Sequence, residues 1–199
     1  MRAGILNKTA YDFLYKMTNA DLHLVLDFFS VWVYYNITER DKEITKMKNI
    51  PNEIVFDMDG TIADLYAVEN WLPKLRAEDA SPYVEAAPMW DMEALATILN
   101  ALRASGITIT VVTWLSKDST ESYKKAVREA KLKWLAEHGF PFDHFHGVQY
   151  GATKANSVRK YTNNAWLIDD NAQVRKGWHL GEAIDPTTCN LLEVLANLI

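Results

Sequence analysis

The sequence predicts an α/β fold, in which a parallel β-sheet is covered by helices on both faces. Of the 199 residues, 49% are hydrophobic and 24% are charged, which is the balance of an ordinary globular protein. From Glu53 onward, short apolar runs alternate with segments of helical periodicity. This alternation is typical of repeated strand–helix units. We expect helices first, then the order β, insert, α, β, α, β, α, β, α.

Four apolar runs predict the strands. The clearest, residues 107–113, is rich in β-branched side chains, which favour strands. Residues 144–148 give a weaker pattern. The predicted strands are 53–56, 107–113, 144–148 and 165–168.

Apolar residues at helical spacing predict the helices between these strands. One stripe covers residues 92–102 and stops at Gly106, and a second covers 123–134 and stops at Gly139. Leucines at 191, 192, 195 and 198 predict a last helix. We interpret the first two stripes as core-facing and infer no cofactor from them.

Residues 1–50 differ in character from the rest and predict a helical extension. Asp21 is a suitable N-cap for a helix whose positions 22–35 are apolar except for a narrow polar stripe. A helix this apolar is buried on most sides, which suits packing on the main domain or a homodimer interface. The apolar stretch is shorter than the roughly 20 residues of a membrane span. We place the domain boundary at Pro51, so that residues 51–199 form the main domain.

Cysteine content and charge limit the class of protein. The single Cys189 excludes an intramolecular disulfide framework and a multi-cysteine zinc site. No signal peptide is recognised, so we expect a cytoplasmic protein with no membrane partner. The net charge of −5 disfavours nucleic acid as a partner. A small phosphorylated substrate remains compatible with it.

Polar residues stand directly after three of the predicted strands, and one basic residue opens a helical segment. Ligands of parallel α/β sheets bind at the carboxyl ends of the strands, so these residues are the candidates for chemistry. They are Asp57, Asp59, Gly60 and Thr61 after the first strand, Thr113 and Trp114 after the second, Lys154 at the helix start, and Asp169 and Asp170 after the fourth.

Four carboxylates brought to one edge of a sheet predict a bound cation. Without a cation, like charges in a partly desolvated site repel one another and shift each other's pKa. No histidine or cysteine stands among these candidates, and an all-oxygen site suits Mg²⁺. A metal, an aspartate nucleophile, a second aspartate for proton transfer, a hydroxyl and a lysine are the groups that phosphoryl transfer requires.

The order of these residues resembles the four motifs of the haloacid dehalogenase (HAD) superfamily over about residues 53–185. The resemblance implies a three-layer Rossmann-like fold and a phosphatase that forms an aspartyl-phosphate. It implies that Asp57 is the nucleophile and Asp59 the general acid and base. Thr113 and Lys154 would hold the phosphoryl group.

The same resemblance implies a Mg²⁺ site formed by Asp57, the backbone carbonyl of Asp59, Asp169 and Asp170. We expect Asp170 to be the direct ligand of the last pair. We also assign Gly60 and Thr61, which end the first motif, to substrate binding.

Each motif also has a purely structural interpretation. Residues 57–61 suit a turn or a calcium loop, although residues 62, 63 and 65 supply no further oxygen ligands. Lys154 can be a solvent-exposed helix residue, and Thr113 can be an ordinary strand residue. Asp169 and Asp170 can cap the helix that follows them. The order of the motifs favours the functional interpretation of all of them.

The insert at about residues 62–92 predicts a small helical cap over the site. Tyr66 and Trp71 in it, together with Trp114, are our candidates to contact substrate, because stacking on a nucleobase contributes roughly 1–3 kcal/mol per base. Tyr83 and Trp90 are also in the insert. Any of these rings can instead form the core of the cap, and we favour that role for Trp90.

Within the superfamily, the sequence is most similar to the 5′(3′)-deoxyribonucleotidases. The similarity lies in the strings 57–60, 63–64, 133–139, 153–154 and 167–170. It implies a nucleoside monophosphate substrate. In contrast to that family, the cap is short and Trp114 stands where a small hydroxyl residue is usual.

Two other functions remain open. The run 168–170 followed by Gln173-Val174 also resembles the 3′-phosphatase module of polynucleotide kinases, whose substrate calls for a basic channel. The second is a non-catalytic binding or scaffold module that uses residues 1–50, which would tolerate a damaged site. The sequence does not decide between water and another phosphoryl acceptor.

Overall fold

The computed structural model describes residues 50–158, 162 and 164–199. The expected helical extension and its dimer interface lie outside the described residues. The domain boundary at Pro51 and the limits of the cap therefore stay predictions.

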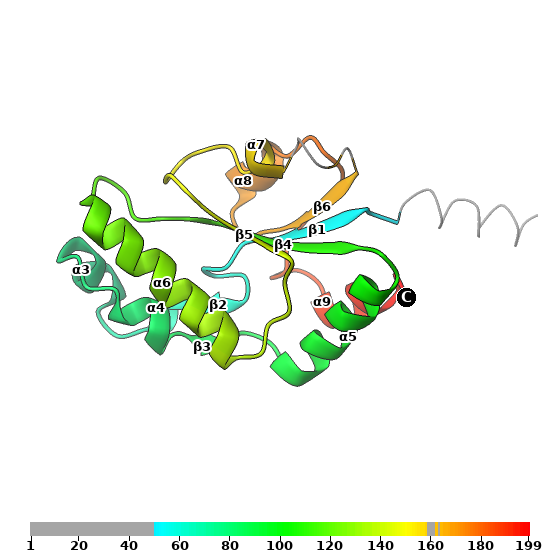
Figure 1. Ribbon diagram of the computed structural model, residues 1–199, viewed down its shortest axis with the longest axis horizontal. Coiled ribbons are helices and arrows are strands. Elements are labelled where there is room, and N and C mark those ends of the chain that lie inside the picture. The colour runs from blue at the N-terminus through cyan, green and yellow to red at the C-terminus, as the bar shows by residue number, and fades with distance from the viewer. Residues whose placement is uncertain (1–49, 159–161, 163) are drawn as a thin grey trace, which may run out of the picture. The chain divides into compact units, whose positions relative to one another are not determined.

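Among the described residues, five parallel strands form the central sheet, in the spatial order β5-β4-β1-β6-β7. Figure 1 labels the first four of them. The chain starts in the middle of the sheet, moves outward to one edge and then returns to build the other, which is doubly wound topology. The strands are β1 (Glu53–Phe56), β4 (Thr108–Trp114), β5 (His144–Val148), β6 (Ala165–Ile168) and β7 (Ala183–Ile184). The predicted α/β fold class is confirmed.

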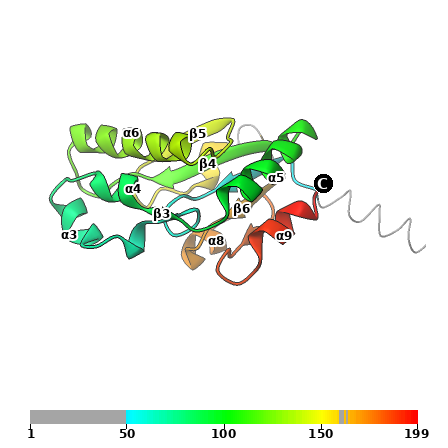
Figure 2. The ribbon, with the colours of Figure 1, turned by 90° about the horizontal axis from the view of Figure 1, so that it is seen from below.

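Helices cover both faces of this sheet because its central strands are apolar on both sides. All four residues of β1 are buried, and Val55 packs with α7 (Ala155–Val158) and with Trp178 on one face. Side chains alternate along a strand, so Ile54 and Phe56 project to the other face. There α5 (Met92–Ala104) and α9 (Leu191–Ala196) lie side by side (Figure 2).

Capping residues begin the two longest helices of the described part of the chain. Asp91 accepts hydrogen bonds from the backbone N–H groups of Glu93 and Ala94 at the start of α5. Thr120 caps α6 (Glu121–Glu137) by accepting from Tyr123. The predicted stop after α5 is confirmed, since Gly106 has φ +95°, a conformation that side chains disfavour.

The segment between β1 and α5, where we expected the cap, holds short elements that pack beside α6 (Figure 1). Tyr83 forms an apolar cluster with Val127 of α6, and the indole N–H of Trp134 donates to the carbonyl of Ala86 at 2.7 Å. The elements are β2 (Ala63–Asp64), the 3₁₀ helix η1 (Leu65–Ala67), α3 (Trp71–Arg76), α4 (Ser81–Glu85) and β3 (Ala87–Pro88).

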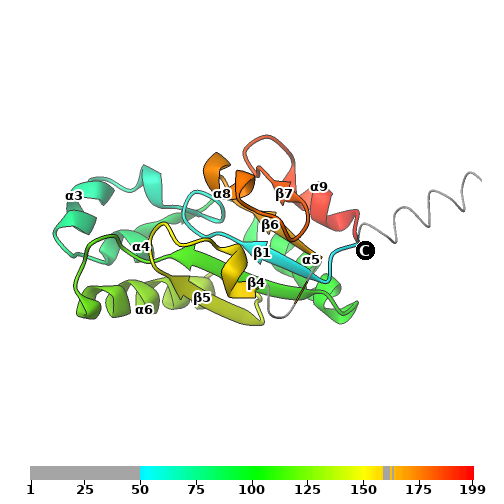
Figure 3. The same cartoon turned by 90° about the horizontal axis from the view of Figure 1, so that it is seen from above.

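Within the described residues, the structure adds three short strands to those expected. Two of them, β2 and β3, pair antiparallel within the insert. The third, β7, extends the central sheet beyond β6, and Figure 3 shows it at that edge. It has two residues and no hydrophobic alternation, so the sequence offers no signal for it. Within the described part of the chain, no helix is long and apolar enough to cross a membrane.

Candidate active site

The first and last motifs lie next to each other because β1 pairs with β6. The backbone N–H of Asp57 donates to the carbonyl of Ile168 at 2.9 Å, so the carboxyl ends of the two strands are adjacent. Asp57 follows β1, and Asp169 and Asp170 follow β6. The structure therefore brings together the residues that the sequence placed at these two strand ends.

Lys154 connects these carboxylates from the start of α7. Its ammonium Nζ lies 2.7 Å from Oδ1 of Asp57 and 2.7 Å from Oδ2 of Asp169. The lysine is 2% exposed, which contradicts the interpretation of Lys154 as a solvated helix residue. A buried ammonium needs such partners, because its desolvation is costly without them.

The electrostatics of this cluster reflect burial and crowding of like charge. Burial, with the charge of Asp57 second, raises the pKa of Asp169 to about 6. The same two causes raise the pKa of Asp170. Burial lowers the pKa of Lys154, but the charges of Asp57 and Asp169 outweigh it and raise that pKa above its ordinary value.

Three of these carboxylates fit a divalent cation. Asp57, Asp169 and Asp170 each offer one oxygen, and these oxygens lie within 4.8 Å of one another. The donors are all carboxylate oxygens, which suit a hard cation such as Mg²⁺. The side chain of Asp59 is outside this group, because its carboxylate pairs with Lys131 of α6 at 2.5 Å. Its predicted contribution through the backbone carbonyl stays a prediction.

Gly60 and Thr61 lie next to Asp170. A side chain on Gly60 would collide with the Tyr66 ring at 2.5 Å and with Oδ2 of Asp170 at 2.7 Å, and φ is +76°. Thr61 has no exposed surface, and its hydroxyl accepts a hydrogen bond from the backbone N–H of Asp170 at 3.1 Å. Neither residue lines the cavity described below, and both lie against Asp170. The substrate contacts predicted for Gly60 and Thr61 stay predictions.

Thr113 lies at the end of β4 beside Lys131. The residue has no exposed surface, and its hydroxyl accepts a hydrogen bond from Lys131 at 2.7 Å. The phosphate contact predicted for Thr113 stays a prediction. Burial raises the pKa of the neighbouring Asp59, and Lys131 opposes that rise.

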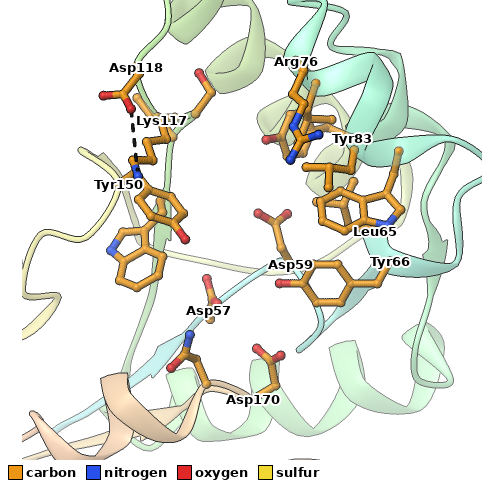
Figure 4. Close-up of a pocket in the computed structure, with 17 residues that line it drawn as sticks. Asp57, Asp59, Leu65, Tyr66, Arg76, Tyr83, Lys117, Asp118, Tyr150 and Asp170 are labelled. Carbon is orange, nitrogen blue, oxygen red and sulfur yellow. Dashed lines mark ion pairs between the residues drawn. The ribbon is translucent and has the colours of Figure 1, made fainter.

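A cavity of about 550 Å³ opens above these residues. Figure 4 shows the carboxylates of Asp57, Asp59 and Asp170 gathered on one side of it. We call these three residues, with the buried Lys154 and Asp169, the floor of the cavity. The volume is within the usual range for a small-molecule site.

Two pairs of aromatic rings form opposite walls of the cavity. Tyr66 and Trp71 of the insert meet edge to face, with ring centroids 5.2 Å apart. Across the opening, Trp114 and Tyr150 lie 4.9 Å apart, and Figure 4 shows Tyr150 facing the side that carries Tyr66. We call these four residues the walls. The predicted residues Tyr66, Trp71 and Trp114 are thus brought to one cavity.

The remaining insert aromatics have structural contacts. Tyr83 is 4% exposed and belongs to the cluster on α6, although one edge reaches the cavity. Trp90 donates its indole N–H to the carbonyl of Thr61 at 2.8 Å and does not line the cavity. This placement agrees with the core role that we favoured for Trp90.

The helix-cap interpretation of the last motif is wrong. Asn171 is the N-cap of α8 (Ala172–Lys176), and its side chain accepts from the backbone N–H of Gln173 at 2.9 Å. Asp169 instead uses both oxygens within the site, Oδ2 toward Lys154 and Oδ1 as acceptor from the N–H of Asn171 at 2.8 Å. Asp170 is left facing the cavity.

Sequence reasoning missed two residues of the site. Lys131 is fully buried although it looks like an ordinary helix lysine, and the available signal was its position four residues after Val127 on the buried stripe of α6. Tyr150 follows β5 by two residues, so the rule used for the other strand ends would have found it.

Comparisons with known proteins give only distant likenesses. No protein-family model matches the chain, and no curated protein matches it significantly. Among solved structures, an RNA repair complex of Pnkp1, Rnl and Hen1 is similar with a TM-score of 0.47 and 16% identity, over 68% of this chain and 42% of that one. This chain therefore spans about two fifths of that protein's length.

A second solved structure is similar at the same level. The D,D-heptose 1,7-bisphosphate phosphatase from Burkholderia thailandensis gives a TM-score of 0.40 and 14% identity, over 65% of this chain and 74% of that one. The assignment of the fold rests on the strand order of the sheet itself.

Proposed function

We propose that the protein is a Mg²⁺-dependent phosphomonoester hydrolase of the HAD type. The observation that carries the proposal is the floor of the cavity, where Lys154 contacts Asp57 and Asp169 at 2.7 Å each and Asp57 opens onto the cavity. A scaffold module would tolerate a damaged site, whereas here Lys154 contacts Asp57 and Asp169, and Asp170 lies close to both carboxylates.

The proposed reaction divides the work among the floor residues. An oxygen of Asp57 attacks phosphorus, and the bond from phosphorus to the substrate oxygen breaks. Asp59, which also faces the cavity, donates a proton to the leaving oxygen and later takes one from the water that hydrolyses the aspartyl-phosphate. Lys154 stabilises the charge of the phosphoryl oxygens.

Asp57, Asp169 and Asp170 would hold Mg²⁺, which neutralises the charge of the transferring group when it is bound. Asp170 is the better candidate for direct coordination, because it faces the cavity and Asp169 already has partners for both oxygens. The donor set supports an oxygen-preferring cation and offers no nitrogen or sulfur ligand.

The proposed substrates are nucleoside monophosphates. The walls support this proposal, since two pairs of aromatic rings face each other above the floor and can take a nucleobase between them. Trp114 is held in place by a hydrogen bond from its indole N–H to the carbonyl of Ala152 at 2.9 Å. A fixed ring loses little conformational entropy when a base stacks on it.

An assay of phosphate release tests the proposal. The panel holds 5′- and 3′-mononucleotides, ribose 5-phosphate and a 3′-phosphorylated oligonucleotide, each with and without Mg²⁺, and Asp57→Asn is the blank. We expect Mg²⁺-dependent release that favours mononucleotides. Preference for the oligonucleotide would replace the substrate class with nucleic-acid ends. Release that persists in Asp57→Asn would overturn the mechanism.

A further inference from the structure

A lysine without exposed surface lies beside the floor and takes no part in the reaction proposed above. Lys131 projects from the buried stripe of α6, among Val127, Ala130 and Trp134. A charged side chain in such a place is costly unless every N–H of the ammonium finds a partner. Such a position calls for an explanation beyond helix packing.

The ammonium of Lys131 is fully engaged. Its Nζ donates to Oδ2 of Asp59 at 2.5 Å, to Oγ1 of Thr113 at 2.7 Å and to the carbonyl of Trp114 at 3.1 Å. An ammonium has three N–H donors, so none is left for a substrate. The Tyr83 ring also lies against the ammonium, with its centroid 4.8 Å from Nζ. Lys131 therefore differs from Lys154, which opens toward the nucleophile.

Asp59 depends on this contact for its position. Within the described part of the chain, the Asp59 carboxylate accepts its hydrogen bond from Lys131. The side chain of Asp59 is 17% exposed and directed into the cavity (Figure 4). Oδ2 of Asp59 is thus held by Lys131 of α6, while the Asp59 carboxylate still reaches the cavity in which a substrate would bind.

We propose that Lys131 is a positioning residue that holds the carboxylate of Asp59 in line with the leaving oxygen. This inference rests on the proposed function, in which Asp59 serves that oxygen. Lys131 also ties the ends of β1 and β4 to α6, which packs against the insert through Tyr83. The helix that contacts Asp59 therefore also belongs to the apolar cluster against which the wall residue Trp71 packs.

The test compares substrates that need a proton donor with one that does not. The variant is Lys131→Met, which keeps an unbranched apolar side chain one atom shorter than lysine and removes the ammonium with its charge. The matched control is Lys133→Met on the same helix, where the side chain is 59% exposed. The readout is kcat/KM for a nucleoside 5′-monophosphate and for 4-nitrophenyl phosphate, whose phenolate leaves without protonation.

We expect Lys131→Met to lose at least about 10-fold more kcat/KM with the nucleotide than with 4-nitrophenyl phosphate, because only the first needs a well-placed acid. The control should change neither value by more than about twofold. Equal losses on both substrates, or no loss, would overturn the proposal, since a purely structural defect does not depend on the leaving group.

A double variant keeps the test decisive if the single variant does not fold. Lys131→Met combined with Asp59→Asn removes both charges of the pair and leaves no unpaired ion. We expect its kcat/KM to equal that of Asp59→Asn within about twofold. A further loss would show that Lys131 acts elsewhere. If Asp59→Asn alone keeps full activity, the proposed function fails instead, so the two failures are distinguishable.

Discussion

The floor and the walls of the cavity differ in how the chain fixes them. The four aspartates of the floor follow β1 or β6 of the parallel sheet. Three floor residues, Asp57, Lys154 and Asp169, are held by ion pairs and have little exposed surface. Wall residues lie at the cavity opening, and Tyr66 and Tyr150 are 51% and 50% exposed. We infer that the sheet determines the chemistry and that the exposed rings determine which substrate is accepted.

The largest effect on activity is expected for Asp59, the proposed general acid among the floor residues. Asp59→Asn keeps the shape of the side chain but cannot exchange the proton, so kcat for a mononucleotide should fall by on the order of 10²–10⁴. Steady-state kinetics measure it, with thermal unfolding as the control for folding. A folded variant that keeps more than about a tenth of the activity would contradict the assigned role.

The next effect concerns the cation and the floor carboxylates. Mg²⁺ at 100 times its Kd should raise the free energy of unfolding of the wild type by about 2.7 kcal/mol, because the ion binds only the folded state. Asp170→Asn should lose this stabilisation. Asp118→Asn is the control, since that carboxylate also lines the cavity but is 86% exposed. Equal stabilisation of all three proteins would remove Asp170 from the metal site.

The walls should affect affinity more than turnover. Tyr150→Ala removes a ring that can stack on the base, so KM for a nucleotide should rise by about 5- to 150-fold, the equivalent of roughly 1–3 kcal/mol. The value of kcat should change little, because ground state and transition state stack alike. Tyr150→Phe keeps the ring and serves as the control. The proposed base contact would be wrong if KM for ribose 5-phosphate rose equally.

The smallest effect on activity is expected at the opposite end of β1. Glu53 is buried there and accepts a hydrogen bond from the Thr110 hydroxyl at 2.5 Å, and burial raises its pKa above 4.5. A raised folded-state pKa gives stability that is present below pH 4.5 and is lost as the pH rises through the folded-state value.

Glu53→Gln should therefore be more stable than the wild type near neutral pH, and the difference should shrink toward pH 4.5. Its kcat should stay within about twofold of the wild type. Denaturant unfolding at several pH values measures the difference. A variant that is less stable at every pH would show that the charge of Glu53 is favourable in the fold.

Much of the fold was predictable because local patterns and tertiary structure agree. The strands 53–56, 144–148 and 165–168 match the structure, and the second strand is shifted by one residue. The exceptions are β2, β3 and β7, whose two residues each are too few to carry a periodicity. β7 pairs because β6 offers an edge to it. A strand of this kind depends on tertiary context.

The site was predictable where spacing along the chain reflects spacing in the sheet. Asp57 and Asp169 meet because both follow paired strands, which the motif order already indicates. The burial of Thr113 and the contact from Lys131 to Asp59 were not predictable, since they depend on how α6 packs and involve residues 72 positions apart. The apolar stripe of α6 indicates which face of the helix is buried, but no short motif indicates which strand end that face meets.

Capture of the covalent intermediate tests the central claim most directly. Asp59→Asn is mixed with 4-nitrophenyl phosphate, whose leaving group needs no acid, and quenched with acid before the slowed hydrolysis is complete. Peptide mapping by mass spectrometry should then find the phosphoryl group on Asp57, and Asp57→Asn should carry none. Phenolate release with no phosphoryl group on Asp57, or with the group on another residue, would contradict the account.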